Sequence, residues 1–222
     1  MSAIGHTNGG AAIKAVIFDF GGVFIDSPFA ALADAAAERG LSPDDLALAV
    51  FGQYDRDTDH PWHRLERGEV TVVEARDEIM ATYSLPDGAP VDPFELLTAL
   101  AGGGIRDDMV AFCRSLRQRD LLTGLLTNNA REFEEFWKPL LPLDELFDDV
   151  VDSSEVGLRK PDPAIYRLSL ERLGVGAGEA AFVDDAPGNV AGAEAVGIAS
   201  VLIGHERADV PVAIAALEAL IG

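Results

Sequence analysis

Short apolar segments alternate with helix-like segments along the second half of this 222-residue chain. Apolar runs typical of buried strands lie at 15–18, 121–127, 147–151, 180–183 and 200–203. Helix-like stretches separate most of them, at 109–119, 131–137, 163–173 and 190–196. Strands that alternate with helices predict β-α-β units, a parallel sheet and right-handed crossovers. We therefore predict an α/β fold whose core is a Rossmann-like, doubly wound parallel sheet.

A second region interrupts this alternation near the start of the chain. Residues 27–105 contain helical patterns but no clear strand. Two helix starts stand out there: Ser42 precedes a proline, and Thr71 with Glu74 forms the pattern of a capping box. We interpret residues 27–105 as an α-helical cap, inserted into a core made of 14–26 and 106–222. Residues 1–13 are small and polar, which predicts a flexible N-terminal tail.

The charge balance restricts the class of partner. Asp and Glu total 38 against 17 Lys and Arg, a formal net charge of -21. This excess argues against a general binder of nucleic acid or of anionic membranes, which needs a basic face. No apolar run approaches the ~20 residues that span a bilayer. Cys113 is the single cysteine, so no intrachain disulfide can form. We expect a cytoplasmic protein, a monomer or a homodimer, that acts on a small molecule.

Two predicted strands end in carboxylates. Asp19 follows the first strand and precedes a glycine pair at 21–22, and Asp184 and Asp185 follow the strand near residue 183. Ligands of parallel sheets bind beyond the carboxyl ends of the strands. Adjacent carboxylates at such a place repel each other, and a hard divalent cation such as Mg²⁺ relieves that repulsion. These positions therefore predict a metal site beside a reacting group.

Two more polar pieces occupy corresponding positions. Thr127 and Asn128 close a predicted strand, where a hydroxyl and amide N–H groups can hold an anion. An alternative is that Asn129 and Glu132 merely cap the next helix. Lys160 stands before a proline that favours an extended backbone, which makes it a candidate phosphate ligand and a cation that orients a nucleophile.

Taken in order, these pieces resemble the four motifs of the haloacid dehalogenase superfamily, most members of which are Mg²⁺-dependent phosphohydrolases. The motifs are Asp19-Phe20-Gly21-Gly22-Val23, Thr127-Asn128, Lys160-Pro161 and Asp184-Asp185. The Asp-x-Gly-Gly-Val form is similar to the subgroup that contains the phosphatase domain of soluble epoxide hydrolases. The resemblance implies a capped, Mg²⁺-dependent phosphomonoester hydrolase that forms an aspartyl-phosphate on a small phosphorylated metabolite.

The resemblance also implies a role for each matched residue. Asp19 would attack phosphorus, and Lys160 would neutralise charge on Asp19 and on the phosphoryl group. Thr127 and the amide of Asn128 would hold the phosphoryl oxygens. The oxygen ligands of Mg²⁺ would be Asp19, the backbone carbonyl of Gly21 and Asp184. Asp185 and Asn189 would support these ligands.

Gly21 departs from the usual pattern. Most phosphatases of the superfamily carry a second Asp at this position as general acid and base, a function worth ~10²–10⁴-fold in rate. The substrate could have a good leaving group, or His60, His63 or Asp26 could deliver the proton. The chain could also be a catalytically weak protein that binds phosphate esters.

A metal-free 2-haloacid dehalogenase of the same fold is a further alternative. Such relatives usually have Tyr at the position of Gly21 and do not need the acidic pair at 184–185, which counts against this alternative.

The cap contains a segment dense in polar and aromatic groups. We expect some of the residues His60, Trp62, His63 and Arg64 to line the substrate pocket. The alternative is that Trp62 packs inside the cap while the other three side chains are solvated. In the core, we expect the aromatic pair at 136–137 to pack helices against the sheet.

Overall fold

The computed structural model describes residues 12–222, apart from 86–87, 89, 91 and 95–103. Its centre is a five-stranded sheet in the order β3-β2-β1-β4-β5, and every neighbouring pair is parallel. The strands are β1 (Ala15–Phe18), β2 (Leu122–Thr127), β3 (Asp149–Asp152), β4 (Ala180–Asp184) and β5 (Ala199–Leu202). The predicted doubly wound α/β core is confirmed.

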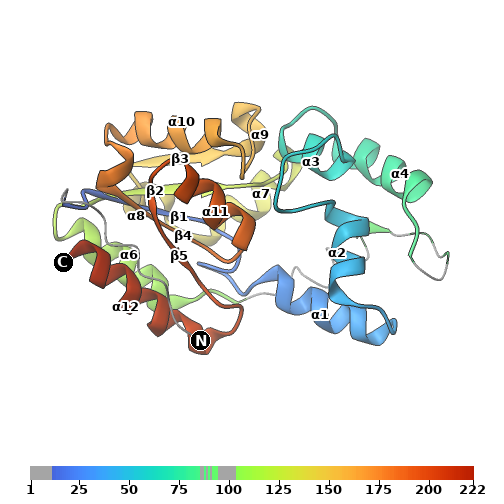
Figure 1. The fold of residues 1–222 in the computed structure, drawn as a ribbon, viewed down its shortest axis with the longest axis horizontal. Helices are drawn as coiled ribbons and strands as arrows, with labels where there is room; N and C mark the ends of the chain where they lie inside the picture. The colour runs from blue at the N-terminus through green and yellow to red at the C-terminus, as the bar shows by residue number, and fades with distance from the viewer. Residues whose placement is uncertain (1–11, 86–87, 89, 91, 95–103) are drawn as a thin grey trace.

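Helices cover both faces of this sheet (Figure 1). Helices α6 and α12 pack on one face, and α10 and α11 pack on the other. The α-helices of the core are α6 (Asp107–Arg117), α7 (Glu134–Trp137), α8 (Leu143–Leu146), α9 (Ser153–Val156), α10 (Pro163–Leu173), α11 (Pro187–Ala195) and α12 (Val210–Ile221). Short 3-10 turns are η1 (Arg131–Phe133), η2 (Lys138–Leu140), η3 (Ala177–Glu179) and η4 (Arg207–Asp209).

Strand β1 shows why the central strands are apolar along their whole length. Val16 and Phe18 join the hydrophobic cluster under α6 and α12, whereas Ala15 and Ile17 join the cluster under α10 and α11. Successive side chains of a strand point to opposite faces, and both faces are covered here. All four side chains are therefore fully buried.

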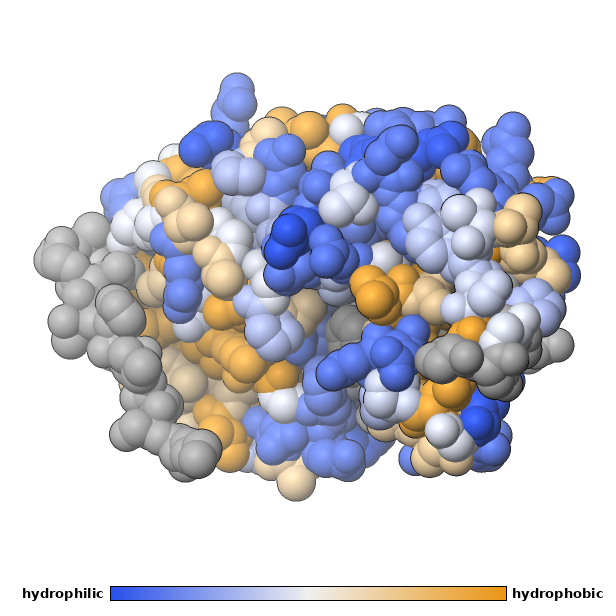
Figure 2. All heavy atoms as spheres, turned by 45° about the vertical axis from the view of Figure 1, so that its right-hand side comes forward, coloured by the Kyte–Doolittle hydropathy of each residue, from blue (hydrophilic) through white to orange (hydrophobic). Residues whose placement is uncertain are grey.

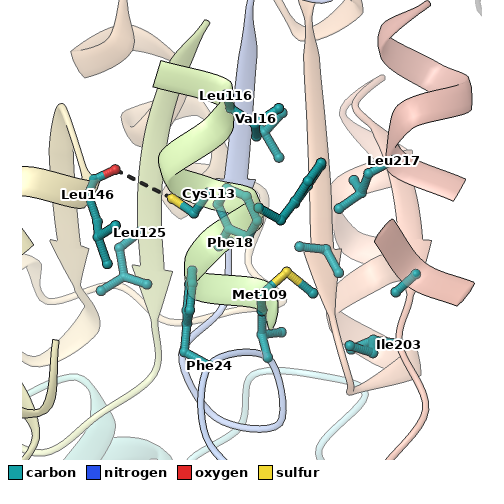
Figure 3. Close-up of a cluster of buried hydrophobic side chains, with 14 of the residues drawn as sticks. Val16, Phe18, Phe24, Met109, Cys113, Leu116, Leu125, Leu146, Ile203 and Leu217 are labelled. Carbon is teal, nitrogen blue, oxygen red and sulfur yellow. Dashed lines mark hydrogen bonds between the residues drawn. The ribbon is translucent and has the colours of Figure 1, made fainter. Parts of the chain in front are cut away.

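Cys113 lies inside the cluster under α6 and α12 (Figure 3). Its Sγ is 3.5 Å from the carbonyl oxygen of Leu146, and its neighbours include Phe18 and Leu125. Burial raises the pKa of the Cys113 thiol to about 12. The residue is a small apolar packing element, because its thiol stays protonated and out of contact with solvent.

The aromatic pair at the end of α7 divides between core and solvent. Trp137 is buried, with its ring 5.2 Å from that of Phe20, as expected. Phe136 is 74% exposed, so the prediction that it packs against the sheet is wrong. Neighbouring residues on a helix point about 100° apart, and the short α7 buries only the face that carries Trp137.

The cap forms its own helical cluster to one side of the sheet (Figure 1). The two predicted helix starts are confirmed, because the Ser42 side chain accepts from the Asp45 amide and Thr71 forms a complete capping box with Glu74. The predicted cap boundaries stay a prediction. The described cap helices are α1 (Pro28–Glu38), α2 (Pro43–Phe51), α3 (Pro61–Glu66) and α4 (Val72–Thr82).

The two chain segments that connect core and cap run side by side. Ile25 and Ile105 form an antiparallel bridge. The Asp26 carboxylate accepts from the amide of Gly104 at 2.9 Å and from the Arg207 guanidinium at 2.8 Å. We call this pairing the hinge, because it fixes both connections to the same point of the core.

The predicted tail lies mostly outside the described residues, although Ile13 already packs in the core. Hydrophilic residues cover much of the face drawn in Figure 2, with apolar residues in several separate groups. None of the helices in the described part of the chain is both long and apolar enough to cross a membrane.

Candidate active site

Sheet register brings Asp19 and Asp184 together. Strand β1 pairs with β4 so that Phe18 lies opposite Val183, and the Asp19 amide donates to the Val183 carbonyl at 2.9 Å. The next residues, Asp19 and Asp184, are therefore neighbours at the carboxyl ends of the two strands. The strand order changes direction between β1 and β4, which is where doubly wound sheets bind ligands.

Lys160 joins the two carboxylates. Its Nζ lies 2.7 Å from Asp19 Oδ1 and 2.7 Å from Asp184 Oδ2, and its side chain is 1% exposed. Burial opposes the charged form of Lys160, but Asp184 and Asp19 outweigh that effect and raise its pKa. The site thus holds a charged ammonium between the ends of β1 and β4.

The backbone of Lys160 is held by Asn128. The Lys160 amide donates to Asn128 Oδ1 at 2.8 Å, and Asn128 Nδ2 donates to the Lys160 carbonyl at 3.0 Å. Thr127, the last residue of β2, is buried and directly precedes Asn128 in the chain. The structure thus links the second and third predicted motifs through a side-chain clamp that the sequence did not indicate.

Asp184 is held in a single orientation by groups that follow it. Its Oδ1 accepts from the Ala186 amide at 2.8 Å, and Asn189 Nδ2 lies 3.0–3.1 Å from both of its carboxylate oxygens. Asp185 is fixed separately, because the Ser27 hydroxyl donates to its Oδ2 at 2.6 Å. Asp185 and Asn189 therefore lie where supporting residues were predicted.

The carboxylates fit a hard divalent cation. Asp19, Asp184 and Asp185 are all buried, and each offers an oxygen within 4.8 Å of those offered by the other two. Burial raises the pKa of Asp19; Lys160 works against this rise, and Asp184 adds to it. Burial likewise raises the pKa of Asp184. Three crowded oxygen donors with one ammonium leave negative charge that Mg²⁺ can neutralise, and an all-oxygen donor set suits that ion.

Steric constraints require glycine at the second position of the glycine pair that follows Asp19. Gly22 has φ +69°, and a Cβ at this position would overlap the carboxylate of Asp185. Only glycine permits both this backbone conformation and this close approach. Gly21 is half-buried and places no side chain beside Asp19, so the usual second acid has no substitute at that position.

The two histidines proposed as proton donors are occupied inside the cap. His60 Nδ1 accepts from the Trp62 amide at 3.1 Å, and His63 Nδ1 accepts from the Thr58 amide at 3.0 Å. Burial, reinforced by the charge of Arg159, lowers the pKa of His60 to about 4 and that of His63 to about 3. Both rings are neutral at pH 7, which does not favour either as a general acid.

Asp26 is equally unsuited to deliver a proton. The hydrogen bond from Arg207 at the hinge lowers its pKa, so that it remains a carboxylate. These observations favour the alternative in which the substrate has a good leaving group.

The remaining predicted cap residues contact other parts of the cap. Trp62 is buried, and its Nε1 donates to Glu66 at 2.9 Å. The Arg64 guanidinium pairs with Glu78 at 3.1 Å near the surface. These contacts favour the packing of Trp62 inside the cap, but His60 and His63 are buried as well, so the part of that alternative in which they are solvated is wrong. That some of the residues His60, Trp62, His63 and Arg64 line a substrate pocket stays a prediction.

The alternative that Asn129 caps the following helix is wrong. The residue at the start of η1 is Ala130, with no capping side chain, and Asn129 Oδ1 accepts from the adjacent Ala130 amide. Glu132 instead accepts from the amide of Val72 in the cap at 3.0 Å. A contact with a distant part of the chain has replaced the local one.

Sequence reasoning missed Arg159, the residue before Lys160. Its side chain is fully buried, and its Nε donates to Glu66 Oε2 at 2.7 Å. The guanidinium also lies 5.6 Å from the centre of the Tyr54 ring. Glu66 and Arg159 are 93 positions apart, so no local pattern could have indicated this pair.

The comparisons with known proteins agree with the assembled motifs. A family model described as haloacid dehalogenase-like hydrolase matches residues 13–197. The chain belongs to this family. The chain is therefore a hydrolase, as its motif order predicted, and the superfamily assignment is confirmed.

Its relatives carry the names of three kinds of enzyme. Acyl-CoA dehydrogenase family member 10 of Mus musculus is 32% identical over 97% of this chain, which spans only 20% of that protein. Phosphoglycolate phosphatase of Rhodospirillum rubrum is 29% identical over 90% of this chain and 83% of the relative. (S)-2-haloacid dehalogenase 4A of Burkholderia cepacia is 25% identical over 88% of this chain and 84% of the relative.

One solved structure shows the same fold with ligands bound. It is a haloacid dehalogenase-family enzyme of Bacteroides thetaiotaomicron in complex with magnesium and inorganic phosphate, with a TM-score of 0.58 and 21% identity. The match covers 87% of this chain and 95% of that one. At this level of identity the likeness concerns the fold.

Proposed function

We propose that this protein is a Mg²⁺-dependent phosphomonoester hydrolase that forms an aspartyl-phosphate on Asp19. The observation that carries the proposal is the position of Lys160 Nζ, 2.7 Å from both Asp19 and Asp184 at the ends of β1 and β4. A buried cation at this place offsets the repulsion between an anionic nucleophile and an anionic phosphate. The phosphatase among the relatives supports the same chemistry.

The reaction proceeds in two displacements at phosphorus. A carboxylate oxygen of Asp19 forms a bond to phosphorus, while the ester P–O bond breaks and its electron pair leaves with the substrate oxygen. Water then attacks the same phosphorus and the bond between phosphorus and the Asp19 oxygen breaks, which releases inorganic phosphate and a proton and restores the Asp19 carboxylate. The hydroxyl of Thr127 and the backbone amide of Asn128 hold the phosphoryl oxygens, and Lys160 keeps Asp19 oriented.

The metal site uses residues already fixed by the sheet. Asp19, the carbonyl of Gly21 and Asp184 would hold Mg²⁺, with Asp185 and Asn189 in support. The ion, when bound, supplies positive charge that balances the carboxylates and the phosphoryl oxygens.

The missing acid at Gly21 narrows the substrate class. With no side chain there, and with His60 and His63 neutral and bonded inside the cap, the leaving oxygen must depart with little help from a protonated group. We therefore propose a small metabolite with a good leaving group, such as a sugar 1-phosphate or an acyl phosphate.

The decisive experiment assays purified protein on a panel of phosphate esters and 2-haloacids, with and without Mg²⁺. We expect phosphate release that requires both Mg²⁺ and Asp19, and loss of at least about 10³-fold in kcat for Asp19→Asn. Asp108→Asn, an exposed change on α6, is the matched control.

Two outcomes would contradict the proposal. Halide release without metal would identify the protein as a 2-haloacid dehalogenase, the activity named for the relative from Burkholderia cepacia. Saturable binding of phosphate esters without turnover would identify a binding protein.

A further inference from the structure

Arg159 belongs to the core by sequence, but its side chain is bonded to the cap. Among the residues that the structure describes, all of its side-chain partners lie within the cap segment 54–66. The Nε donates to Glu66 at 2.7 Å, Nη1 donates to the carbonyl of Arg56 at 3.2 Å, and the Asp57 carboxylate lies 3.6 Å from Nη1. The guanidinium is therefore one point at which the core binds the cap, in addition to the contact between Glu132 and Val72.

The partner carboxylate is oriented in advance by the cap itself. Glu66, at the end of α3, is 3% exposed. Its Oε1 accepts from Trp62 Nε1 at 2.9 Å and from the Tyr54 hydroxyl at 3.3 Å, which leaves Oε2 directed at Arg159. This preorganisation means that little side-chain freedom is lost when Arg159 binds.

The same contacts hold the cap loop at the strand ends. On one side of residues 54–57 lies Arg159, which directly precedes Lys160. On the other side lies Gly188 in the first turn of α11, where an added Cβ would come within 2.6 Å of Asp55 Cα and 3.1 Å of the Tyr54 carbonyl oxygen. The cap loop therefore lies between the residue before the catalytic lysine and the helix that follows the acidic pair.

The electrostatics of Tyr54 agree with this placement. Its pKa is raised, first by burial and then by Glu66, with further contributions from the carboxylates of Asp19 and Asp184. The ring thus lies within the electric field of the proposed nucleophile and metal ligand. The Asp19 side chain is only 11% exposed with the cap in this position.

We propose that Arg159 is a positioning residue, whose buried ion pair with Glu66 holds cap loop 54–57 closed over Asp19 and Lys160 while the reaction takes place. The proposal rests on the hydrolase activity proposed above. Opening the cap separates two buried charges, and closing it restores a bond that the core alone does not supply. The ion pair therefore sets how much of the time the site is shut around its substrate.

The test compares Glu66→Gln with Glu78→Gln. Glutamine at 66 keeps an acceptor for Trp62 and Tyr54 but removes the charge that faces Arg159, whereas Glu78 pairs with Arg64 at the surface of the same cap. For Glu66→Gln we expect kcat/KM to fall about 10²-fold, with kcat lowered and KM raised. We expect less than about a two-fold change for Glu78→Gln.

Hydrogen exchange supplies a readout independent of turnover. In Glu66→Gln, amides of 53–66 should exchange faster while those of β1 and β4 keep the wild-type rate. Arg159→Lys keeps the charge but loses the planar guanidinium fork. It should therefore retain more of kcat/KM, and more protection from exchange at 53–66, than Arg159→Met. The double variant Glu66→Gln/Arg159→Met should lose less than the sum of the single losses, because the two residues act as one pair.

The outcomes separate this proposal from the previous one. Wild-type exchange at 53–66 in Glu66→Gln, Arg159→Lys and Arg159→Met would overturn the ion-pair proposal even in an active enzyme. Faster exchange at 53–66 in the variants, together with no hydrolysis of phosphate esters by the wild type, would overturn the proposed function and keep the ion pair as the closure of the cap. If Glu66→Gln fails to fold by circular dichroism, Arg159→Lys decides by the same two readouts.

Discussion

Lys160 and Arg159 are consecutive, buried and positively charged, yet they stabilise different parts of the molecule. Lys160 links two strand ends of the core, Asp19 and Asp184, whose closeness follows from the register of β1 and β4. Arg159 links the core to Glu66, whose position depends on how the cap folds and docks. One cation is placed by the ends of the sheet strands, and its neighbour by the interface that we propose opens and closes. In our proposals, Lys160 thus serves the reaction and the adjacent Arg159 controls access to the site.

The largest effect should come from removing the cation of the core. In Lys160→Met the buried carboxyls of Asp19 and Asp184 lose their counter-charge, and breaking such a buried pair costs about 3–5 kcal/mol of stability. We expect kcat to fall by at least about 10²–10³-fold, since the charge faces the reacting phosphate. Urea unfolding and steady-state kinetics measure both. Wild-type turnover in a folded Lys160→Met protein would contradict the assigned role of this residue.

Mg²⁺ should stabilise the core and leave the cap contacts unchanged. At about 100 times its dissociation constant, a ligand of the folded state adds ~2.7 kcal/mol to the free energy of unfolding. We expect this gain as a rise in Tm for the wild type and its loss in Asp184→Asn. Glu66→Gln should keep the gain, because it leaves all three carboxylates of the site intact. Equal Tm shifts in wild type and Asp184→Asn would remove Asp184 from the metal site.

Gly22→Ala tests the close approach between the first and last motifs. The added Cβ meets the Asp185 carboxylate in a backbone conformation that alanine rarely adopts. We expect a loss of about 1–3 kcal/mol in stability and weaker Mg²⁺ binding, measured by unfolding and by calorimetry. Gly40→Ala has the same sign of φ and open space around its Cβ, so it separates the backbone cost from the overlap. Equal losses in both variants would show that the overlap is harmless.

Acidification should weaken the cap through His63. Its pKa is about 3 in the folded protein and 6.5 in its ordinary state, so between these values only the unfolded chain binds the proton. Stability is therefore full above pH 6.5 and falls toward pH 3, by about 1.4 kcal/mol per pH unit for this group. His63→Asn should remove the contribution of this group and leave that of His60, whose pKa is lowered to about 4, as measured by urea unfolding across this range. An unchanged slope in the variant would assign the acid sensitivity to other groups.

Much of the core could be predicted because its signals are local. Strand β1 and helix α10 have the predicted bounds, since an unbroken apolar run and a proline start followed by a glycine end identify them without reference to neighbours. The meeting of Asp19 with Asp184 followed from a general rule about the ends of parallel strands. Each of these inferences needed only the residue pattern and one topological principle.

Phe136 apart, the failures have a different cause, which is contact between distant segments. Glu132 bonds to Val72 in the cap, and this contact replaces the capping box expected with Asn129. Arg159 and Glu66 meet only because the cap docks beside Lys160. Helix α12 was not predicted, since its run of small apolar residues lacks a clear polar face until it packs against α6 and the sheet.

The hinge has a practical consequence for engineering. Ile25 and Ile105 lie opposite each other where the chain leaves the core and where it returns. A short turn that joins the two strands of this bridge could therefore replace the whole insertion without redirecting β1 or α6. The two connections thus form a single attachment point for the cap. A different cap could be grafted there while the sheet keeps its carboxylates in register.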